Sequence, residues 1–257
     1  MQCFKDLFFA VLVGSLPVFG ITGCASKTGN QVGVGAELLA ADETGTIHRL
    51  RIDGIDVDPK NSKGELALFA VSYQDPSDSN WKNFCLPDPD GVSRAIPLPG
   101  FWDKSGNFNE KEGTITFACT SGVIAKCVRW GYIPWKNVQG KSLKDLHQAC
   151  TRMARADYCG NGKSHTRDGT MIDVFDPLGI QKRTDDDKFF FEAAWSTDGA
   201  TYVAKARWFE TLEEIVKECP EKLKGHTALD NPPLSPEEIM NKWPKTLIFN
   251  SSHKREK

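Results

Sequence analysis

Residues 155–169 read RADYCGNGKSHTRDG, and this stretch decides how the rest of the sequence is interpreted. It brings a tyrosine, a cysteine, a histidine and several charged residues together with three glycines. Glycines of this kind end helices and form turns. Two interpretations are open: the segment is a reactive cysteine site, or it is a helix end that a disulfide fixes in place.

The residues before this stretch predict a helix. Ser142 is followed three residues later by Asp145, a capping-box arrangement that satisfies backbone N–H groups at a helix N-terminus. Helical spacing continues to the glycines at 160 and 162, which are expected to end the helix. Its apolar stripe comprises Leu143, Leu146, Cys150, Met153 and Ala154.

Asp157 falls in the middle of that apolar stripe when each residue turns the helix by about 100°. A buried carboxylate is costly unless it is paired or hydrogen bonded. Its candidate partners are the backbone N–H groups of residues 160–162 and the side chains of His165, Arg167 and Arg129. We expect a structural network that ties the helix to the loop, with a catalytic or ligand-binding carboxylate as the alternative.

Cys159, His165 and Asp168 carry the side chains of a cysteine hydrolase, with Asp157 as a second candidate to orient the histidine. A nucleophilic thiolate needs a nearby cation or a helix N-terminus. Cys159 instead follows a predicted helix C-terminus, whose partial negative charge disfavours a thiolate. We therefore favour a disulfide for Cys159 and keep a hydrolase or transferase site as the alternative.

Cysteine usage indicates an oxidising compartment. Of eight cysteines, Cys3 and Cys24 lie near the N-terminus. An even number of further cysteines in an exported chain predicts up to three disulfides, whose pairing the sequence leaves open. A zinc site is not expected, because no C-x-x-C pair is present. The disulfide candidates are Cys85, Cys119, Cys127, Cys150, Cys159 and Cys219.

The N-terminus predicts export and lipidation. Lys5 precedes an apolar run over residues 7–20, which is short for a bilayer span and typical of a secretory signal. The following Ile-Thr-Gly-Cys, residues 21–24, resembles the lipobox of bacterial lipoproteins. That resemblance implies a signal peptide over residues 1–23 and acylation of Cys24. An ordinary signal peptide is the alternative.

Residues 24–36 are small and polar, and suit a flexible tether behind the lipid anchor. Ala25 and Ser26 do not resemble the inner-membrane retention signal of enterobacterial lipoproteins, which favours the outer membrane. The rest of the sequence has no second long apolar run, so the only membrane partner expected is the one reached through the anchor.

Period-two alternation within residues 44–73 predicts antiparallel strands. TITFAC (114–119) and VIAKCVRWGY (123–132) are interpreted as another strand pair, and residues 189–195 and 202–208 as a hairpin. Two shorter helices are expected to begin at Thr211 with Glu214 and at Ser235 with Glu238.

These elements predict an α+β fold of mostly antiparallel strands with a few helices, stapled by disulfides. We expect one domain over residues 37–250, followed by a polar, disordered tail over residues 251–257.

Several separated blocks resemble the bacterial ADYC domain, named for the residues that stand here as Ala156 to Cys159. The blocks are GFWD (100–103), FACTSGVIAKCVRWGYIPW (117–135), DLHQACTRMARADYC (145–159) and SHTRDGTMIDVFDPLGI (164–180). The likeness covers roughly residues 95–220. It implies an exported bacterial protein, and it carries over no catalytic residues.

Aromatic residues supply one further candidate site. Trp130, Tyr132 and Trp135 cluster in one segment, with Trp102 as a candidate neighbour. If Trp130 and Tyr132 lie on one strand, both face the same side and suit a glycan or peptide. Core packing is the interpretation that we favour.

Acidic residues and overall charge point to no further ligand. Asp168, Asp173, Asp176 and residues 185–187 lack the regular spacing of a calcium-binding loop and are expected to lie in solvated turns. No cofactor motif is present, and a net charge of −2 predicts no nucleic-acid partner.

The sequence therefore predicts a lipid-anchored protein of the bacterial cell envelope. We expect a non-catalytic binding or structural module at the membrane surface, with an envelope protein or a glycan as its ligand. The alternative is an envelope hydrolase or transferase that uses Cys159 or the group Asp157, His165 and Asp168.

Overall fold

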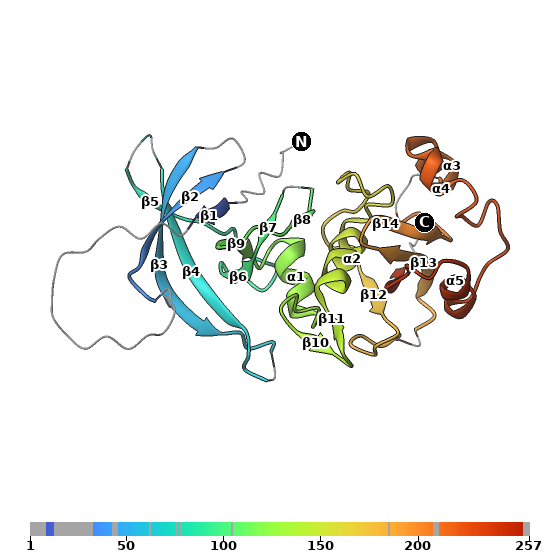
Figure 1. Cartoon of the computed structure of the whole chain (residues 1–257), viewed down its shortest axis with the longest axis horizontal. Coiled ribbons are helices and arrows are strands. Elements are labelled where there is room, and N and C mark those ends of the chain that lie inside the picture. The colour runs from blue at the N-terminus through green and yellow to red at the C-terminus, as the bar shows by residue number, and fades with distance from the viewer. Residues whose placement is uncertain are drawn as a thin grey trace. The chain divides into compact units, whose positions relative to one another are not determined.

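A computed structural model describes residues 9–12, 33–42, 46–61, 63–75, 77, 79–103, 105–184, 186–207 and 211–253. The chain divides into two compact units, each described by itself (Figure 1). The first unit consists of Met1–Asp103 and Phe108–Ala125, and the second of Lys104–Asn107 and Lys126–Lys257. The expectation of one domain over residues 37–250 concerns how the chain folds and stays a prediction.

The first unit is an antiparallel barrel. Its strands follow the order β3-β2-β1-β9-β6-β4, and β4 pairs again with β3, so this ring of strands closes on itself. Strand β5 pairs with β4 outside the ring, and β7 and β8 form a separate short hairpin. The strands are β1 (Phe9–Leu12), β2 (Glu37–Asp42), β3 (Ile47–Val57), β4 (Ala67–Gln74), β5 (Trp81–Asn83), β6 (Ala95–Pro99), β7 (Phe101–Trp102), β8 (Phe108–Asn109) and β9 (Thr114–Cys119).

Alternation along β3 and β4 builds the barrel core, as the sequence predicts for residues 44–73. Leu50 and Ile52 are fully buried, whereas Arg51 between them is half-buried and Arg49 before them is exposed. These inward residues pack with Val71 of β4 and Phe117 of β9 in one cluster. The disulfide Cys85–Cys119 lies in the same cluster and fixes the segment after β5 to the end of β9.

The second unit contains an antiparallel sheet with the strand order β12-β15-β13-β14. Its strands are β12 (Ile172–Phe175), β13 (Phe189–Ser196), β14 (Gly199–Val203) and β15 (Ile248–His253), with β10 (Asn137–Val138) and β11 (Lys141–Ser142) as a small separate pair. Helix α2 (Lys144–Arg155) packs against β13, β14 and β15 through its apolar face. The predicted hairpin is confirmed in part: β13 and β14 pair antiparallel across a short turn, but β14 begins at Gly199, inside the predicted turn, and ends at Val203.

The described residues also form four helices shorter than α2: α1 (Val123–Arg129), α3 (Leu212–Glu218), α4 (Pro220–Leu223) and α5 (Pro236–Lys242). The predicted helix starts at Thr211 and Ser235 are confirmed. Each side chain accepts a hydrogen bond from the backbone of Glu214 or Glu238, and the glutamate bonds back to the cap. The predicted α+β class, with mostly antiparallel strands and disulfide staples, is confirmed.

The prediction of a strand over VIAKCVRWGY is wrong. Val123–Arg129 forms α1, in which Ile124, Cys127 and Val128 are buried. Their spacing of three and four residues places them on one face of a helix, which is what a packed helix requires. Only the preceding TITFAC forms the expected strand, β9.

The capping box at Ser142 is also wrong. Ser142 lies in β11, paired with Asn137, so its backbone is committed to a strand ladder. Helix α2 begins at Lys144, after Leu143 as the N-cap, whose side chain makes no capping bond. The Ser142 hydroxyl accepts from the N–H of Lys144 at 3.3 Å, but the reciprocal bond of a capping box is not formed. The predicted apolar stripe is nevertheless correct, since its members are buried from Leu143 to Ala154.

The disordered tail predicted over residues 251–257 begins too early in the sequence, because β15 includes residues 251–253. Strand β15 continues to His253 as an inner strand of the sheet, and Ser251 and Ser252 are buried. Polar residues are tolerated there because Asn250 and Ser252 donate to the buried carboxylate of Glu192. Residues 254–257 lie outside the described part of the chain.

Candidate functional site

The ADYC stretch follows α2 as a reversed turn. Ala156 adopts the left-handed conformation, with φ of 51°, and its N–H donates to the carbonyl of Met153. The N–H of Asp157 donates to the carbonyl of Arg152, five residues earlier. This pair of hydrogen bonds is the Schellman motif, which satisfies the last carbonyls of a helix. The helix therefore ends before the glycines at 160 and 162.

Asp157 is fully buried, as predicted, although it lies in the turn after α2 and not on the helix. Its partners come from both sides of the turn. Its carboxylate accepts from Nη1 of Arg152 at 2.8 Å and from the backbone N–H groups of Asn161 and Gly162 at 3.1 and 2.9 Å. The predicted bonds to the glycine segment are thus present. The charged partner is Arg152, which the sequence analysis did not consider.

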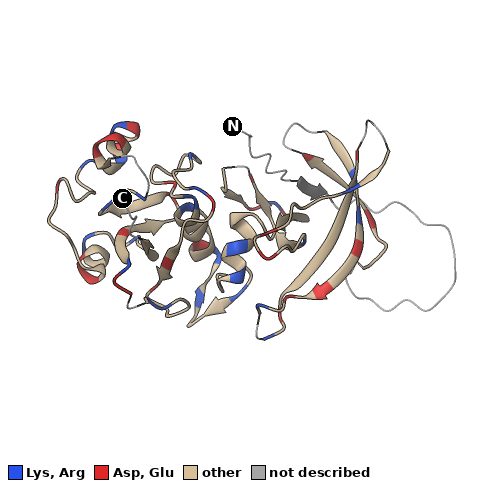
Figure 2. Ribbon diagram, turned by 180° about the vertical axis from the view of Figure 1, so that it is seen from behind, with Lys and Arg blue, Asp and Glu red and all other residues tan. Residues whose placement is uncertain are grey.

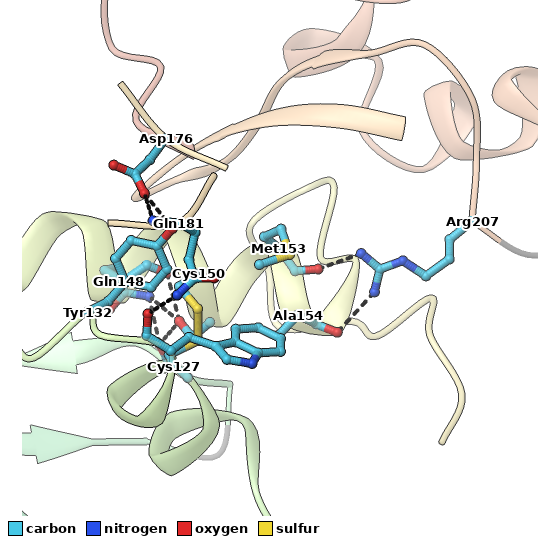
Figure 3. Close-up of a disulfide and its surroundings, with 12 residues drawn as sticks. Cys127, Tyr132, Gln148, Cys150, Met153, Ala154, Asp176, Gln181 and Arg207 are labelled. Atoms are coloured by element: carbon cyan, nitrogen blue, oxygen red, sulfur yellow. Dashed lines mark hydrogen bonds between the residues drawn. A yellow bond between two sulfur atoms is a disulfide. The ribbon is translucent and has the colours of Figure 1, made fainter. Parts of the chain in front are cut away.

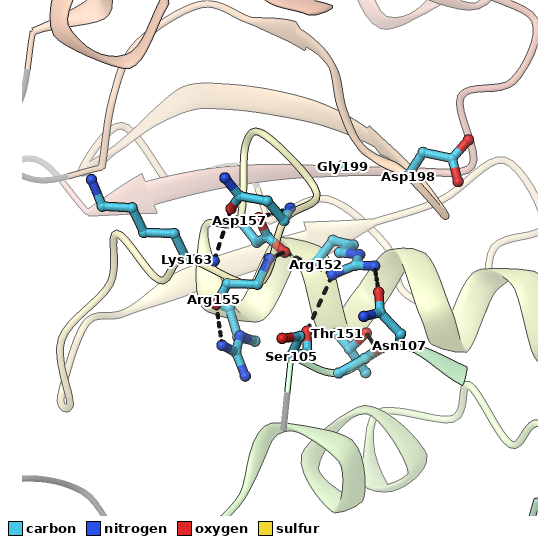
Figure 4. A network of polar contacts seen from close by, with 12 residues as sticks. Ser105, Asn107, Thr151, Arg152, Arg155, Asp157, Lys163, Asp198 and Gly199 are labelled. Carbon is cyan, nitrogen blue, oxygen red and sulfur yellow. Dashed lines mark hydrogen bonds and ion pairs between the residues drawn. The ribbon is translucent and has the colours of Figure 1, made fainter. Parts of the chain in front are cut away.

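Arg152 extends this network to other segments of the second unit (Figure 4). Its guanidinium donates to the carbonyl oxygens of Ser105 and Thr197, each at 3.1 Å, and to the side chain of Asn107. A buried charge is stable when it is paired and its remaining donors are satisfied. The Asp157–Arg152 pair therefore joins α2 to residues 105–107 and to the β13–β14 turn.

Tyr158 joins the turn to a second buried ion pair. Its hydroxyl donates to Oε1 of Glu192 at 3.0 Å and accepts from the backbone N–H of Arg207 at 2.9 Å. Burial, and then the Glu192 carboxylate, raise the pKa of Tyr158 well above its ordinary value. Its carbonyl oxygen also accepts from the N–H of Ala200 in β14. Tyr158 is held as a neutral hydrogen-bonding group.

Glu192 and Arg207 form that second pair, with both side chains fully buried. Glu192 also accepts from Asn250 and Ser252 of β15. The guanidinium of Arg207 donates to the carbonyl oxygens of Met153 and Ala154 at 2.7 and 3.0 Å, so a cation caps the C-terminus of α2 (Figure 3).

Cys159 is bonded to Cys219, across 60 residues of sequence. Its sulfur is therefore part of a disulfide in this structure and not a thiol. The disulfide ties the turn after α2 to the junction of α3 and α4. Together, the four residues of the motif end the helix at Ala156, hold its end through the polar groups of Asp157 and Tyr158, and link it by the disulfide of Cys159.

The other candidate catalytic residues are not assembled around Cys159. His165 is buried, and the carboxylate at its Nε2 is that of Glu218, at 3.3 Å. Asp168 is exposed, whereas Asp157 faces Arg152. The carboxylate in contact with His165 is therefore that of Glu218, and not one of the two that the sequence offered as orienting groups.

The remaining disulfide of the second unit, Cys127–Cys150, is fully buried and links α1 to α2. Beside it, the hydroxyl of Tyr132 donates to Asp176 at 2.9 Å (Figure 3). Burial, and then the neighbouring Asp176, raise the pKa of Tyr132. All six cysteines predicted to form disulfides are therefore paired.

The candidate aromatic residues do not share one exposed face. Trp102 is buried in the first unit against Phe108, with ring centroids 4.5 Å apart. Tyr132 is buried in the second unit, and Trp130 follows α1 and is partly buried. Trp135 is 44% exposed and is the member of the set that is open to solvent.

The prediction of solvated turns is wrong for Asp173 and Asp176, because both are buried and Asp173 lies in β12. Asp173 accepts from the N–H and hydroxyl of Thr184, and Asp176 accepts from the N–H groups of Leu178 and Gln181. Within the described residues, no group of three or more His, Cys, Asp or Glu side chains is placed to hold a metal ion.

The predicted lipid anchor falls outside this description. Cys24 and the tether up to residue 32 are not among the described residues. In the part of the chain that the structure covers, no helix is both long and apolar enough to cross a membrane.

Comparison with known protein families identifies a match to this chain. Neither the curated proteins nor the solved structures include a significantly similar chain. The model of the ADYC domain matches residues 31–209, which is most of the chain and begins earlier than the resemblance in the sequence. The match includes the turn built by Ala156, Asp157, Tyr158 and Cys159. This chain belongs to the ADYC domain family.

Proposed function

We propose that this protein is a lipid-anchored protein of the bacterial cell envelope whose disulfide-stapled body binds or organises a partner at the membrane surface without catalysis. Acylation of Cys24 supplies the anchor. Each buried methylene contributes roughly 0.8 kcal/mol to membrane binding, so several acyl chains hold a protein stably.

The pairing of the cysteines is the observation that carries this proposal. The six cysteines from Cys85 to Cys219 are all bonded to one another. Cys24 therefore has no partner among them, which is what acylation of its sulfur requires. Three disulfides also suit an oxidising compartment outside the cytoplasm.

The polar groups of the ADYC turn support a non-catalytic role. Cys159, Asp157 and Tyr158 all hold the end of α2 against other segments, and their polar atoms are used in those contacts. Lys, Arg, Asp and Glu are interspersed along both units (Figure 2). This charge pattern favours an envelope protein or a glycan as partner over nucleic acid, which needs a basic surface.

Lipid labelling in cells tests the anchor. Cells that express the protein are fed radiolabelled palmitate, membranes are separated, and the N-terminus of the extracted protein is determined by mass spectrometry. We expect label at Cys24, a chain that begins at this residue, and recovery with the outer membrane. Cys24→Ser should abolish both the labelling and the recovery of the protein with the outer membrane. The matched variant Cys3→Ser should change neither result.

Turnover of an envelope substrate tests the non-catalytic role. If the wild-type protein turns over peptidoglycan fragments or phospholipid, and Asp168→Asn or His165→Gln abolishes this activity in a folded protein, the proposal of a binding module is wrong. Labelling that persists in Cys24→Ser contradicts the anchor independently of that result.

A further inference from the structure

Strand β1 completes the barrel from a segment that the proposed processing removes. Phe9–Leu12 lies antiparallel between β2 and β9 (Figure 1). Ala10 is opposite Ala41 on one side and Thr116 on the other. Cleavage before Cys24 takes β1 away and leaves β2 and β9 on either side of its position.

The barrel is then open at two edges. Neighbouring strands lie about 4.8 Å apart, so β2 and β9 are separated by roughly twice that distance and do not pair directly. Both are antiparallel to β1, and their unpaired backbone groups form a template for another strand. Ala40 and Thr116, which are fully buried beside β1, would face solvent.

We propose that in the mature protein this position receives an extended apolar segment of a partner envelope protein, antiparallel to both β2 and β9. The proposal rests on the proposed function, because it requires removal of the signal peptide. Strand addition is an established mode of peptide recognition, in which main-chain hydrogen bonds supply affinity and alternate side chains supply specificity.

The side chains expected of the partner strand follow from the sequence of β1, whose place it takes. Residues 9–12 read FAVL and are apolar throughout. The nearest mature segment of the chain, residues 24–32, reads CASKTGNQV and is mostly small or polar, which disfavours it as the occupant. A partner therefore has to supply the apolar strand.

Thr114 adds a specific preference. It is buried, lies opposite Leu12, and its hydroxyl has no hydrogen-bond partner among the described residues. Directly opposed residues of antiparallel strands are close enough for their side chains to interact. A partner strand with serine or threonine at the position of Leu12 would satisfy this hydroxyl, because an unmet buried polar group is costly.

Peptide binding to the mature protein tests the proposal. The protein is extracted from membranes in mild detergent, and its N-terminus is determined by mass spectrometry. Fluorescent peptides of sequence LFFAVLVG with a lysine tag are then titrated. We expect the Val11→Pro peptide to bind about tenfold more weakly, since proline removes a backbone donor. We expect the Leu12→Thr peptide to bind roughly fivefold more tightly, an advantage that the Thr114→Val protein loses.

Hydrogen exchange locates the binding. The amides of residues 40–42 and 114–116 should exchange rapidly in the mature protein and become protected when the peptide binds. Protection of both segments without peptide, or equal binding of all three peptides, overturns the proposal. A retained signal peptide overturns the proposed function, and with it this inference. A removed signal peptide without binding overturns the strand site alone.

Discussion

Arg152 and Asp157 form a buried ion pair of 2.8 Å at the C-terminal end of α2. Asp157→Asn keeps an acceptor for the N–H of Gly162 but leaves the Arg152 charge buried without its counter-ion. We expect this variant to lower the free energy of unfolding by about 3–5 kcal/mol. Urea denaturation measures the loss.

Asp168→Asn is the matched control for that variant. Asp168 is exposed in the same loop, and its replacement should change stability by less than about 0.5 kcal/mol. Equal losses in the two variants would contradict a structural role for Asp157.

The sequence predicts that Asp157 is buried, but it does not identify Arg152. The prediction assumes a helix that continues through residue 157, with about 100° per residue. Asp157 lies beyond the end of α2, and the turn after the helix buries it instead. The contact with Arg152 forms because Ala156 turns the chain back in a left-handed conformation. An alanine gives no sequence signal for such a turn, since glycine usually holds that position.

The second buried ion pair, Glu192 with Arg207, can be suspected from the sequence at Glu192. Glu192 interrupts the apolar run FFFEAAWS, and an internal carboxylate in such a strand needs a buried cation. Its cation, Arg207, and its donor Ser252 are distant in sequence, so only the fold brings them together. The same missing partner explains why the polar end of β15 was predicted to be disordered.

Replacing Glu192 should destabilise the protein more than replacing Ser252, one of its hydrogen-bond donors. Glu192→Gln leaves the charge of Arg207 buried and unpaired, and we expect a loss of about 3–5 kcal/mol in unfolding free energy. Ser252→Ala removes one of several donors to Glu192, and about 1 kcal/mol is expected. Chemical denaturation of both variants checks the order, and a reversed order would contradict the network.

The three disulfides should be reduced in order of their exposure. Cys159 and Cys219 are partly exposed, whereas Cys127 and Cys150 are both fully buried. Under mild reductant, alkylation should label Cys159 and Cys219 first and Cys127 and Cys150 last. Peptide mapping by mass spectrometry follows this order. Replacing both Cys159 and Cys219 with serine should cost about 2–4 kcal/mol.

Stability should fall at alkaline pH because the pKa of three tyrosines, Tyr132, Tyr158 and Tyr202, is raised in the folded protein. Burial raises the pKa of Tyr158, and burial with Asp176 raises that of Tyr132. The unfolded chain releases these protons near pH 10, so stability is full below that pH and declines above it. The slope is about 1.4 kcal/mol per pH unit for each tyrosine.

Tyr132→Phe isolates one of these contributions. Asp176 keeps its bonds to the backbone N–H groups of Leu178 and Gln181, so the turn retains most of its support. Denaturant titrations between pH 9 and pH 11 should show a smaller slope than wild type, by up to about 1.4 kcal/mol per pH unit. An unchanged slope would show that Tyr132 ionises in the folded protein.

Gly160 should tolerate no side chain, because it packs against the turn between β13 and β14. Its φ is +71°, and an added Cβ would lie 1.8 Å from the carbonyl oxygen of Asp198. Gly169 is the matched control: its φ of +79° carries the same left-handed strain, but nothing lies within 4 Å of an added Cβ. Gly169→Ala should therefore cost roughly 1–2 kcal/mol. Gly160→Ala should cost roughly 2–5 kcal/mol, because the backbone of Asp198 must also move. Urea denaturation of the two variants separates strain from close approach, and equal losses would mean that the turn after α2 does not pack against the β13–β14 turn.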